Sequence, residues 1–123
     1  MDVRVYLLSK PETVEDFPFG PQAAVYKIAG KMFALTFERG GQPCVNLKCD
    51  PFEAQQLRDV FDTILPGYHM NKRHWITVIL DGAVPDAELR RLIDYSYTLV
   101  IAQLPKAVRQ GLQLRHGLDS LDA

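Results

Sequence analysis

Apolar and polar residues alternate along three segments in the first half of the chain, as they do in β-strands with one buried face. Residues 24–28 and 31–37 alternate in this way on either side of an Ala-Gly pair, and this arrangement predicts a β-hairpin. A third alternating segment, residues 44–48, follows a glycine-rich turn. The first half of the chain is therefore predicted to form three consecutive strands.

Other segments repeat their apolar residues every three to four positions, which is typical of amphipathic helices. Residues 2–9 show this period and predict a short first helix that ends at Lys10-Pro11. A second helix is predicted to begin at Asp50-Pro51, because aspartate caps free N–H groups and proline suits the first helical position. Its apolar positions are predicted to be Ala54, Leu57, Val60, Phe61 and Ile64.

The second half of the chain predicts one more strand and one more helix. Residues 75–80 are rich in β-branched residues and form the strand. The helix begins at Pro85-Asp86 and ends before Leu104-Pro105. Residues 12–21 are predicted to be loop, and the eighteen residues from Lys106 predict no further element and a partly mobile tail.

The predicted order is helix, three strands, helix, strand, helix, without regular βαβ alternation. Such an order favours an α+β fold with a largely antiparallel sheet and helices packed on one face. With 123 residues, the chain is long enough for one domain. Residues 1–109 are predicted to form this domain, and residues 110–123 a C-terminal extension.

Composition places the chain among ordinary globular proteins, with 47% hydrophobic and 24% charged residues. Neither a membrane-spanning apolar run nor a signal peptide is recognisable, so a soluble cytoplasmic protein is expected. The formal net charge is only −1, but the charges are unevenly distributed. Basic residues gather in the predicted strands, loops and tail, and acidic residues gather in the predicted helices; this segregation predicts one cationic side.

Sequence motifs for catalysis are weak. Cys49 lies beside a helix start, but its neighbour Asp50 raises the pKa of a thiol, so a catalytic role is disfavoured. Cys44 and Cys49 are too far apart on one extended strand to form a disulfide. His69 and His74 lack the spacing of a helical zinc site and flank two cations. No enzyme activity and no cofactor are therefore expected.

Two stretches concentrate cationic, polar and aromatic residues: residues 26–31 and residues 66–75. The alternation assigns several of their side chains to the sheet face opposite the helices, which is expected to be exposed to water. These side chains belong to Lys27, Asn46, Lys48, Trp75 and Thr77. Cations beside an exposed indole suit a surface that stacks bases and contacts phosphates. The alternative is that Trp75 packs at the core edge and the lysines only protect sheet edges.

Several of these stretches closely resemble the MmcQ/YjbR family. The most specific is Pro-Gly-Tyr-His-Met-Asn-Lys-Arg-His-Trp at residues 66–75. The other matching stretches are residues 16–20, 25–35, 45–51, 92–97 and 104–106. The resemblance extends from about residue 2 to residue 109. It implies a frataxin-like (CyaY-like) two-layer sandwich and a DNA-binding role, but no iron chemistry, because the first helix lacks a dense acidic ridge.

Together these observations predict a non-enzymatic, sequence-indifferent DNA-binding protein. The candidate contact residues are Lys27, Lys31, Lys48, His69, Asn71, Lys72, Arg73, His74 and Trp75. The lysines and Arg73 are expected to contact phosphates, with His74 and Trp75 stacking or packing beside the backbone. Two alternatives remain open: a protein–protein interaction module that uses the same face, and a small-ligand or metal site near His69, His74 and Cys49.

Overall fold

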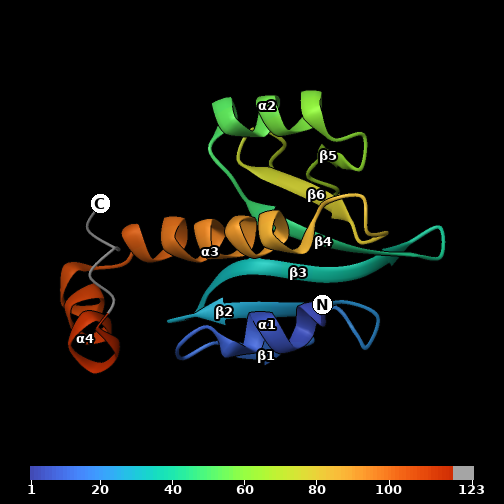
Figure 1. Cartoon of the computed structure of the whole chain (residues 1–123). Coiled ribbons are helices and arrows are strands. Elements are labelled where there is room, and N and C mark those ends of the chain that lie inside the picture. Colours follow the sequence, from blue (N-terminus) through green and yellow to red (C-terminus); the bar gives the residue numbers. More distant parts are fainter. Residues whose placement is uncertain (118–123) are drawn as a thin grey trace.

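The computed structural model describes residues 1–117, which form four helices and six strands (Figure 1). The elements are α1 (Val3–Ser9), β1 (Val14–Asp16), β2 (Ala24–Ile28), β3 (Lys31–Arg39), β4 (Gln42–Lys48), α2 (Pro51–Val60), β5 (Ile64–Pro66), β6 (Trp75–Ile79), α3 (Asp86–Ala102) and α4 (Lys106–His116). All six strands form one sheet in the order β1-β2-β3-β4-β6-β5, and every neighbouring pair is antiparallel. The predicted α+β class with an antiparallel sheet is confirmed.

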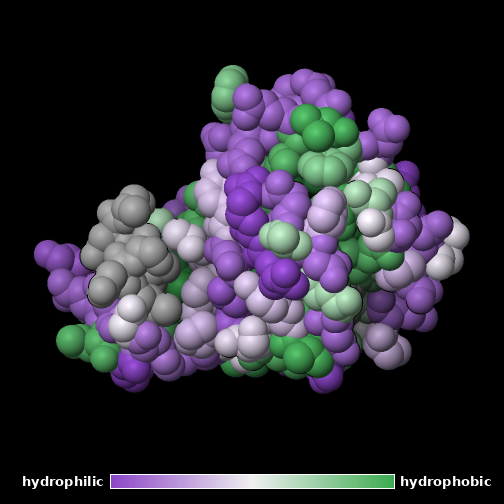
Figure 2. All heavy atoms as spheres, viewed as in Figure 1, coloured by the Kyte–Doolittle hydropathy of each residue, from purple (hydrophilic) through white to green (hydrophobic). Residues whose placement is uncertain are grey.

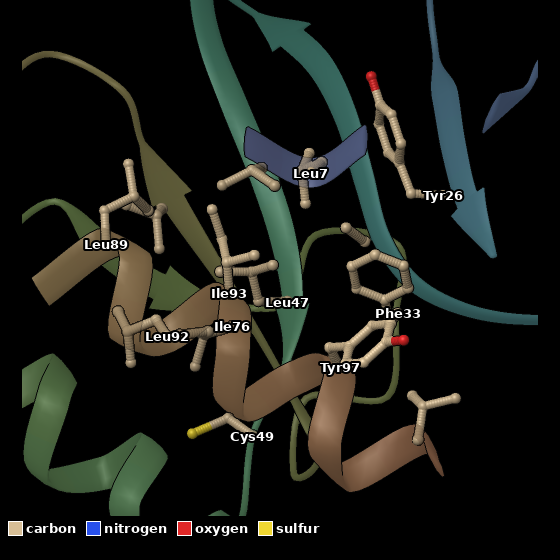
Figure 3. Packing of buried hydrophobic residues seen from close by; sticks show 14 of the residues in the cluster. Leu7, Tyr26, Phe33, Leu47, Cys49, Ile76, Leu89, Leu92, Ile93 and Tyr97 are labelled. Atoms are coloured by element: carbon tan, nitrogen blue, oxygen red, sulfur yellow. The ribbon is translucent and has the colours of Figure 1, made fainter. Parts of the chain in front are cut away.

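The core lies between the sheet and the helices α1, α2 and α3, which cover one face of the sheet (Figure 1). The apolar strand residues that alternate with the predicted outer-face set, and are therefore predicted to face the helices, are all in this core: Tyr26, Ile28, Val45, Leu47, Ile76 and Val78. Figure 3 shows Phe33 and Tyr97 packed beside one another, with ring centroids 5.3 Å apart and nearly perpendicular planes. Such an edge-to-face pair adds about 0.5–1.5 kcal/mol beyond the burial of its apolar area.

The helix starts follow from local hydrogen bonds. The Asp50 carboxylate accepts a hydrogen bond from the backbone N–H of Glu53 at 2.9 Å, and Pro51 occupies the first helical position, as the sequence predicts. Asp2 caps α1 in the same way by accepting from Val5 N at 3.1 Å. Each cap satisfies a backbone donor that has no partner within the helix.

The sequence prediction misses two strands and places one helix end wrongly. Both β1 and β5 have three residues and lie at the two edges of the sheet, where so short a segment shows no clear alternation. The predicted second helix includes Ile64, but α2 ends at Val60, and Ile64 instead begins β5. Val60 is 72% exposed and so does not belong to the buried side of the helix.

The tail beginning at Lys106 was predicted to contain no element, and this prediction is wrong for residues 106–116, which form α4. Leu112 anchors this helix, because its side chain is buried in the core cluster. Arg115 Nε donates to Glu12 Oε2 at 2.7 Å, and His116 Nε2 lies 2.7 Å from the same oxygen. The end of the predicted extension, residues 118–123, lies outside the described residues.

Figure 2 shows the side of the molecule covered by the helices, where hydrophilic residues predominate and hydrophobic residues form separate patches. Among residues 1–117, no helix has the length and apolar character needed to cross a membrane.

Candidate functional site

The cationic stretches predicted from the sequence meet at one end of the sheet. Here β2 and β4 end and β3 and β6 begin, near the junction of α3 and α4 (Figure 1). Lys27 pairs with Met32 across the first hairpin, and Lys48 pairs with Trp75 across the β4–β6 ladder. The backbone N–H of Cys49 also donates to His74 O at 2.8 Å. We call this region, defined by Lys27, Lys31, Lys48, Lys72 and Arg73, the cationic end.

A buried hydroxyl on α3 holds these strand ends in place. Ser96 Oγ accepts a hydrogen bond from the backbone N–H of Lys48 at 2.8 Å and donates to Phe33 O at 2.6 Å. One side chain therefore ties β3 and β4 to the helix that lies over them. Since buried polar groups are costly without partners, these two bonds also explain why a serine is stable inside the core.

The five cations differ in whether another side chain of the protein pairs with them. Lys31, Lys72 and Arg73 are exposed and form no ion pair within residues 1–117. Lys27 Nζ lies 3.3 Å from Asp16 Oδ2, and Lys48 Nζ donates to Gln103 Oε1 at 3.1 Å. The first three cations are therefore the ones most available to an anionic partner.

A cavity of about 260 Å³ lies at the cationic end, between the sheet and the last turn of α3. It is lined by Lys31, Met32, Lys48, Val100, Gln103 and Leu104. Two lysines from neighbouring strands thus border one hollow. This arrangement favours an anion there, because two ammonium groups can share a single negative charge.

The sheet face opposite the helices was expected to be exposed to water, and this expectation is wrong over β4 and β6. Trp75 is only 9% exposed, and Asn46 and Thr77 are completely buried. The alternation does place all three on the predicted face. They are buried because the loop of residues 67–74 folds back over these strands. Trp75 therefore cannot serve as the exposed stacking group.

Hydrogen bonds from strand side chains hold this loop against the sheet. Asn46 Nδ2 donates to Tyr68 O at 2.9 Å, and Tyr68 N donates to Thr77 Oγ1 at 2.8 Å. Thr77 Oγ1 in turn donates to Asn46 Oδ1 at 2.5 Å. Gly67 permits the close approach, since a Cβ there would lie 2.7 Å from the Cβ of Trp75.

The remaining predicted contact residues lie in the same loop. Asn71 is used for local structure: its Oδ1 accepts from Arg73 N at 3.0 Å, and its backbone oxygen accepts from His74 N. His69 is exposed and adopts a left-handed backbone conformation, with φ at 58°. The centroids of the His69 and Tyr68 rings are 4.0 Å apart. The loop thus presents Lys72, Arg73 and the two histidines outward.

Beside the loop lies an apolar hollow that the sequence analysis did not find. It has a volume of about 420 Å³ and crosses the outer face of β3, between the loop of residues 67–74 and the segment before β2. We call it the aromatic groove, and its lining residues are Phe19, Ala23, Met32, Leu35, Phe37, Tyr68, His69 and Met70. The alternation of β3 gave a partial signal, because it leaves large apolar residues on the outward face.

Stacked side chains form one wall of the aromatic groove. The rings of Phe37 and Tyr68 lie nearly parallel with centroids 5.7 Å apart, and the guanidinium carbon of Arg39 lies 4.5 Å from the Tyr68 ring centroid. Phe19 is 73% exposed on the opposite side. An aromatic surface of this kind is typical of sites for flat or apolar ligands.

The two cysteines are free thiols buried in the fold, in agreement with the predicted absence of a disulfide. Burial, together with the nearby Glu53 and Asp50 carboxylates, raises the pKa of Cys49 to about 12. A thiol with such a pKa is protonated at neutral pH and is a poor nucleophile or metal ligand. Within residues 1–117, no group of three or more histidine, cysteine or acidic side chains is placed to hold a metal ion.

The fold and site together define a class: a small α+β protein whose single antiparallel sheet carries helices on one face and a cationic end with an adjacent aromatic groove. A family model described as YjbR matches residues 8–99, so the chain belongs to the YjbR family. The resemblance read from the sequence is thereby confirmed at the level of the family.

This chain is similar to several proteins, some compared by sequence and others by solved structure. A protein named YbdF from Escherichia coli O157:H7 is 46% identical over 90 residues, which cover 73% of this chain and 74% of that protein. YjbR from Escherichia coli strain K12 is 34% identical over 105 residues, covering 85% and 89%. The crystal structure of a Deinococcus radiodurans protein with the DUF419 domain has a TM-score of 0.84 and 38% identity, covering 90% of this chain and 85% of that one.

Proposed function

We propose that this protein binds DNA through its cationic end, without recognising base sequence. The observation that carries the proposal is the convergence of Lys31, Lys72 and Arg73, three exposed cations that have no ion pair within residues 1–117. Phosphate contacts supply most of the affinity of non-specific DNA binding, and lysine and arginine are their usual donors.

Three residues of the predicted contact set take lesser roles in this proposal. Lys48 borders the cavity at the cationic end, where it adds a fourth phosphate contact after giving up its bond to Gln103. Lys27 already lies beside Asp16, so we assign it no phosphate. Trp75 is buried, so we assign it no stacking role. Four contacts imply a slope of about −3.6 for log affinity against log salt on duplex DNA.

Titration of a fluorescently labelled DNA duplex at several salt concentrations tests this proposal. The double substitution Lys72→Glu/Arg73→Glu is expected to weaken binding strongly and to make the salt slope shallower by about two, one for each lost contact. Binding that stays undetectable at low salt, or a double variant that binds as tightly as the wild type, would reject DNA binding by this surface.

Arg73→Glu and Arg90→Glu form a matched pair for this test. Both arginines are exposed and both substitutions change the net charge equally, but Arg90 lies in the first half of α3, away from the cationic end. If binding depended only on net charge, the two variants would lose affinity equally. The proposal requires that Arg73→Glu lose clearly more.

A protein-interaction module is the second candidate, and one observation favours it. Phe17 and Phe19, in the segment before β2, are 48% and 73% exposed. Exposed large apolar side chains often mark protein contacts. Pull-down from a lysate with and without nuclease separates the two functions: partners that survive nuclease digestion favour protein binding, and partners lost on digestion favour DNA.

We also propose that the fold is frataxin-like, as the sequence resemblance implies. The support is the two-layer arrangement, with one antiparallel sheet covered on one face by helices. Superposition on a solved frataxin-like structure tests this relation, and a TM-score below about 0.5 would reject it.

A further inference from the structure

The aromatic groove lies directly beside the cationic end. Met32 lines both the groove and the cavity bordered by Lys31 and Lys48, so the two hollows meet at this side chain. On the other side, Lys72 and Arg73 follow Met70 of the groove within three positions along the chain. The aromatic groove therefore has cations of the cationic end as its neighbours on two sides.

This combination suits a ligand that carries flat apolar faces on an anionic backbone. Proteins that bind single-stranded nucleic acids combine a positive path for phosphates with aromatic groups on which bases stack. Phe19 is exposed and available for stacking, and Phe37 and Tyr68, which stack on each other, form the facing aromatic wall. Its lining is almost entirely apolar and so provides few groups for reading base identity, which agrees with binding that is indifferent to sequence.

We propose that the aromatic groove seats an unpaired nucleobase of single-stranded nucleic acid, while the cationic end holds the neighbouring phosphates. This inference rests on the proposed DNA-binding function and adds a preference for single strands. The bases of an intact duplex are stacked inside the helix, so a base could enter the groove only after unpairing, which costs a few kcal/mol. A single strand avoids that cost.

Comparison of three labelled probes by fluorescence anisotropy tests the inference. They are an oligothymidylate of about twelve nucleotides, an oligomer of the same length without bases, and a duplex. Loss of a stacked base weakens binding about five-fold or more, so the oligothymidylate is expected to bind at least that much more tightly than the abasic oligomer. Equal affinities for these two probes would overturn the inference.

Phe19→Ala and Phe52→Ala provide a matched pair of variants. The two phenylalanines are 73% and 72% exposed, so neither substitution removes much buried area, but Phe52 lies on α2, outside the groove. Phe19→Ala is expected to weaken binding of oligothymidylate several-fold and to leave binding of the abasic oligomer unchanged. Phe52→Ala is expected to change neither. An equal effect of both variants would contradict a base in the groove.

The same measurements separate this inference from the proposed function. Duplex binding that depends on Lys72 and Arg73, without any preference for bases over the abasic oligomer, would leave the proposed function intact and reject the groove as a base site. Absence of binding to all three probes at low salt would reject both.

Discussion

Asn46 and Thr77 are polar residues buried on a sheet face that sequence alternation assigns to solvent. Their side chains bond to each other and to the backbone of Tyr68, so the amide oxygen and nitrogen of Asn46 and the hydroxyl of Thr77 all have partners. Hydrogen bonding offsets the cost of removing these groups from water. The pair therefore serves to hold the loop of residues 67–74, which carries Lys72 and Arg73.

Thr77→Val is expected to lower the free energy of unfolding by about 1–3 kcal/mol. Valine keeps the shape of threonine but leaves Tyr68 N and Asn46 Oδ1 without the hydroxyl partner. Urea denaturation measures the change. Thr13→Val is the matched control, because the buried hydroxyl of Thr13 has no hydrogen-bond partner among the described residues. If both substitutions were equally destabilising, the hydrogen-bonded role of Thr77 would be refuted.

Gly67→Ala is expected to destabilise the protein by about 1–3 kcal/mol. The new Cβ would lie 2.7 Å from the Cβ and 2.9 Å from the backbone oxygen of Trp75, neither of which can move without shifting β6. Thermal denaturation measures the loss. Gly111→Ala in α4 is the contrasting variant: its Cβ meets only the flexible end of Arg115, and alanine favours a helix. A stable Gly67→Ala variant would show that the loop has room to move.

Single residues also show what local sequence could and could not predict. The cap at Asp50 was predictable because the donor and acceptor are three residues apart. The face occupied by Trp75 was predictable too, because alternation is a property of neighbouring residues. The burial of Trp75 was not predictable from local sequence. It depends on the loop that covers the neighbouring part of the sheet, and a hydrogen bond between Asn46 and Tyr68, 22 positions apart in the chain, holds that loop in place.

At the scale of elements, the two edge strands depend on contacts outside themselves. In β1, Glu15 accepts two hydrogen bonds from Arg4 of α1, at 2.8 and 2.9 Å, and a third from the Tyr26 hydroxyl at 2.8 Å. The guanidinium of Arg4 lowers the pKa of Glu15. Three residues alone give no strand signal, so β1 is defined by partners that the sequence pattern does not reveal.

The last helix, α4, shows the same dependence. It contains few large apolar residues, and one of them, Leu114, is 87% exposed. The helix is held instead by the burial of Leu112 and by the contacts of Arg115 and His116 with Glu12. Glu12 lies more than 100 positions earlier in the chain, which is why the helix was missed.

Glu12→Gln is expected to loosen α4, because an amide attracts Arg115 less strongly than a carboxylate does. Hydrogen exchange followed by mass spectrometry should then show lower protection of the backbone amides of residues 106–116. Amides of β3 and β4 provide the internal control and should keep their protection. Unchanged protection in α4 would show that Leu112 alone holds the helix.

The pH dependence of α4 provides an independent check. The Arg115 guanidinium and then His116 lower the pKa of Glu12 below its ordinary value of 4.5. The stabilising contact is therefore present above about pH 4.5 and is lost as the pH falls through the lower folded-state pKa. In the wild type, the protection of α4 backbone amides from hydrogen exchange is therefore expected to fall in that pH range, after correction for intrinsic exchange rates. In Glu12→Gln it is expected to show no such step.

At the scale of the whole molecule, the two thiols report on the integrity of the fold. Cys44 and Cys49 are each 1% exposed, and burial raises the pKa of both. Neither thiol is therefore expected to react with iodoacetamide at neutral pH in the native protein, whereas both should react in denaturing urea. Mass spectrometry counts the modified sites. Native labelling as fast as that of the denatured chain would contradict the described burial.

Charge distribution is also a property of the whole molecule. The net charge of −1 gives no hint of the cationic end, whose basic residues come from three separate segments. The sequence indicated which segments are basic. Only the antiparallel pairing of β2, β3, β4 and β6 brings them to the same end of the sheet.

The sequence by itself determined the α+β class, the positions of α1 and α3, the start of α2, the four longer strands and the inward face of the sheet. These features follow from periodicity and capping, which involve residues only a few positions apart. The tertiary structure alone decided the burial of Trp75, the edge strands, the anchoring of α4 and the aromatic groove beside the cationic end. Each of these depends on contacts between segments far apart in the chain, and local sequence patterns do not reveal such contacts.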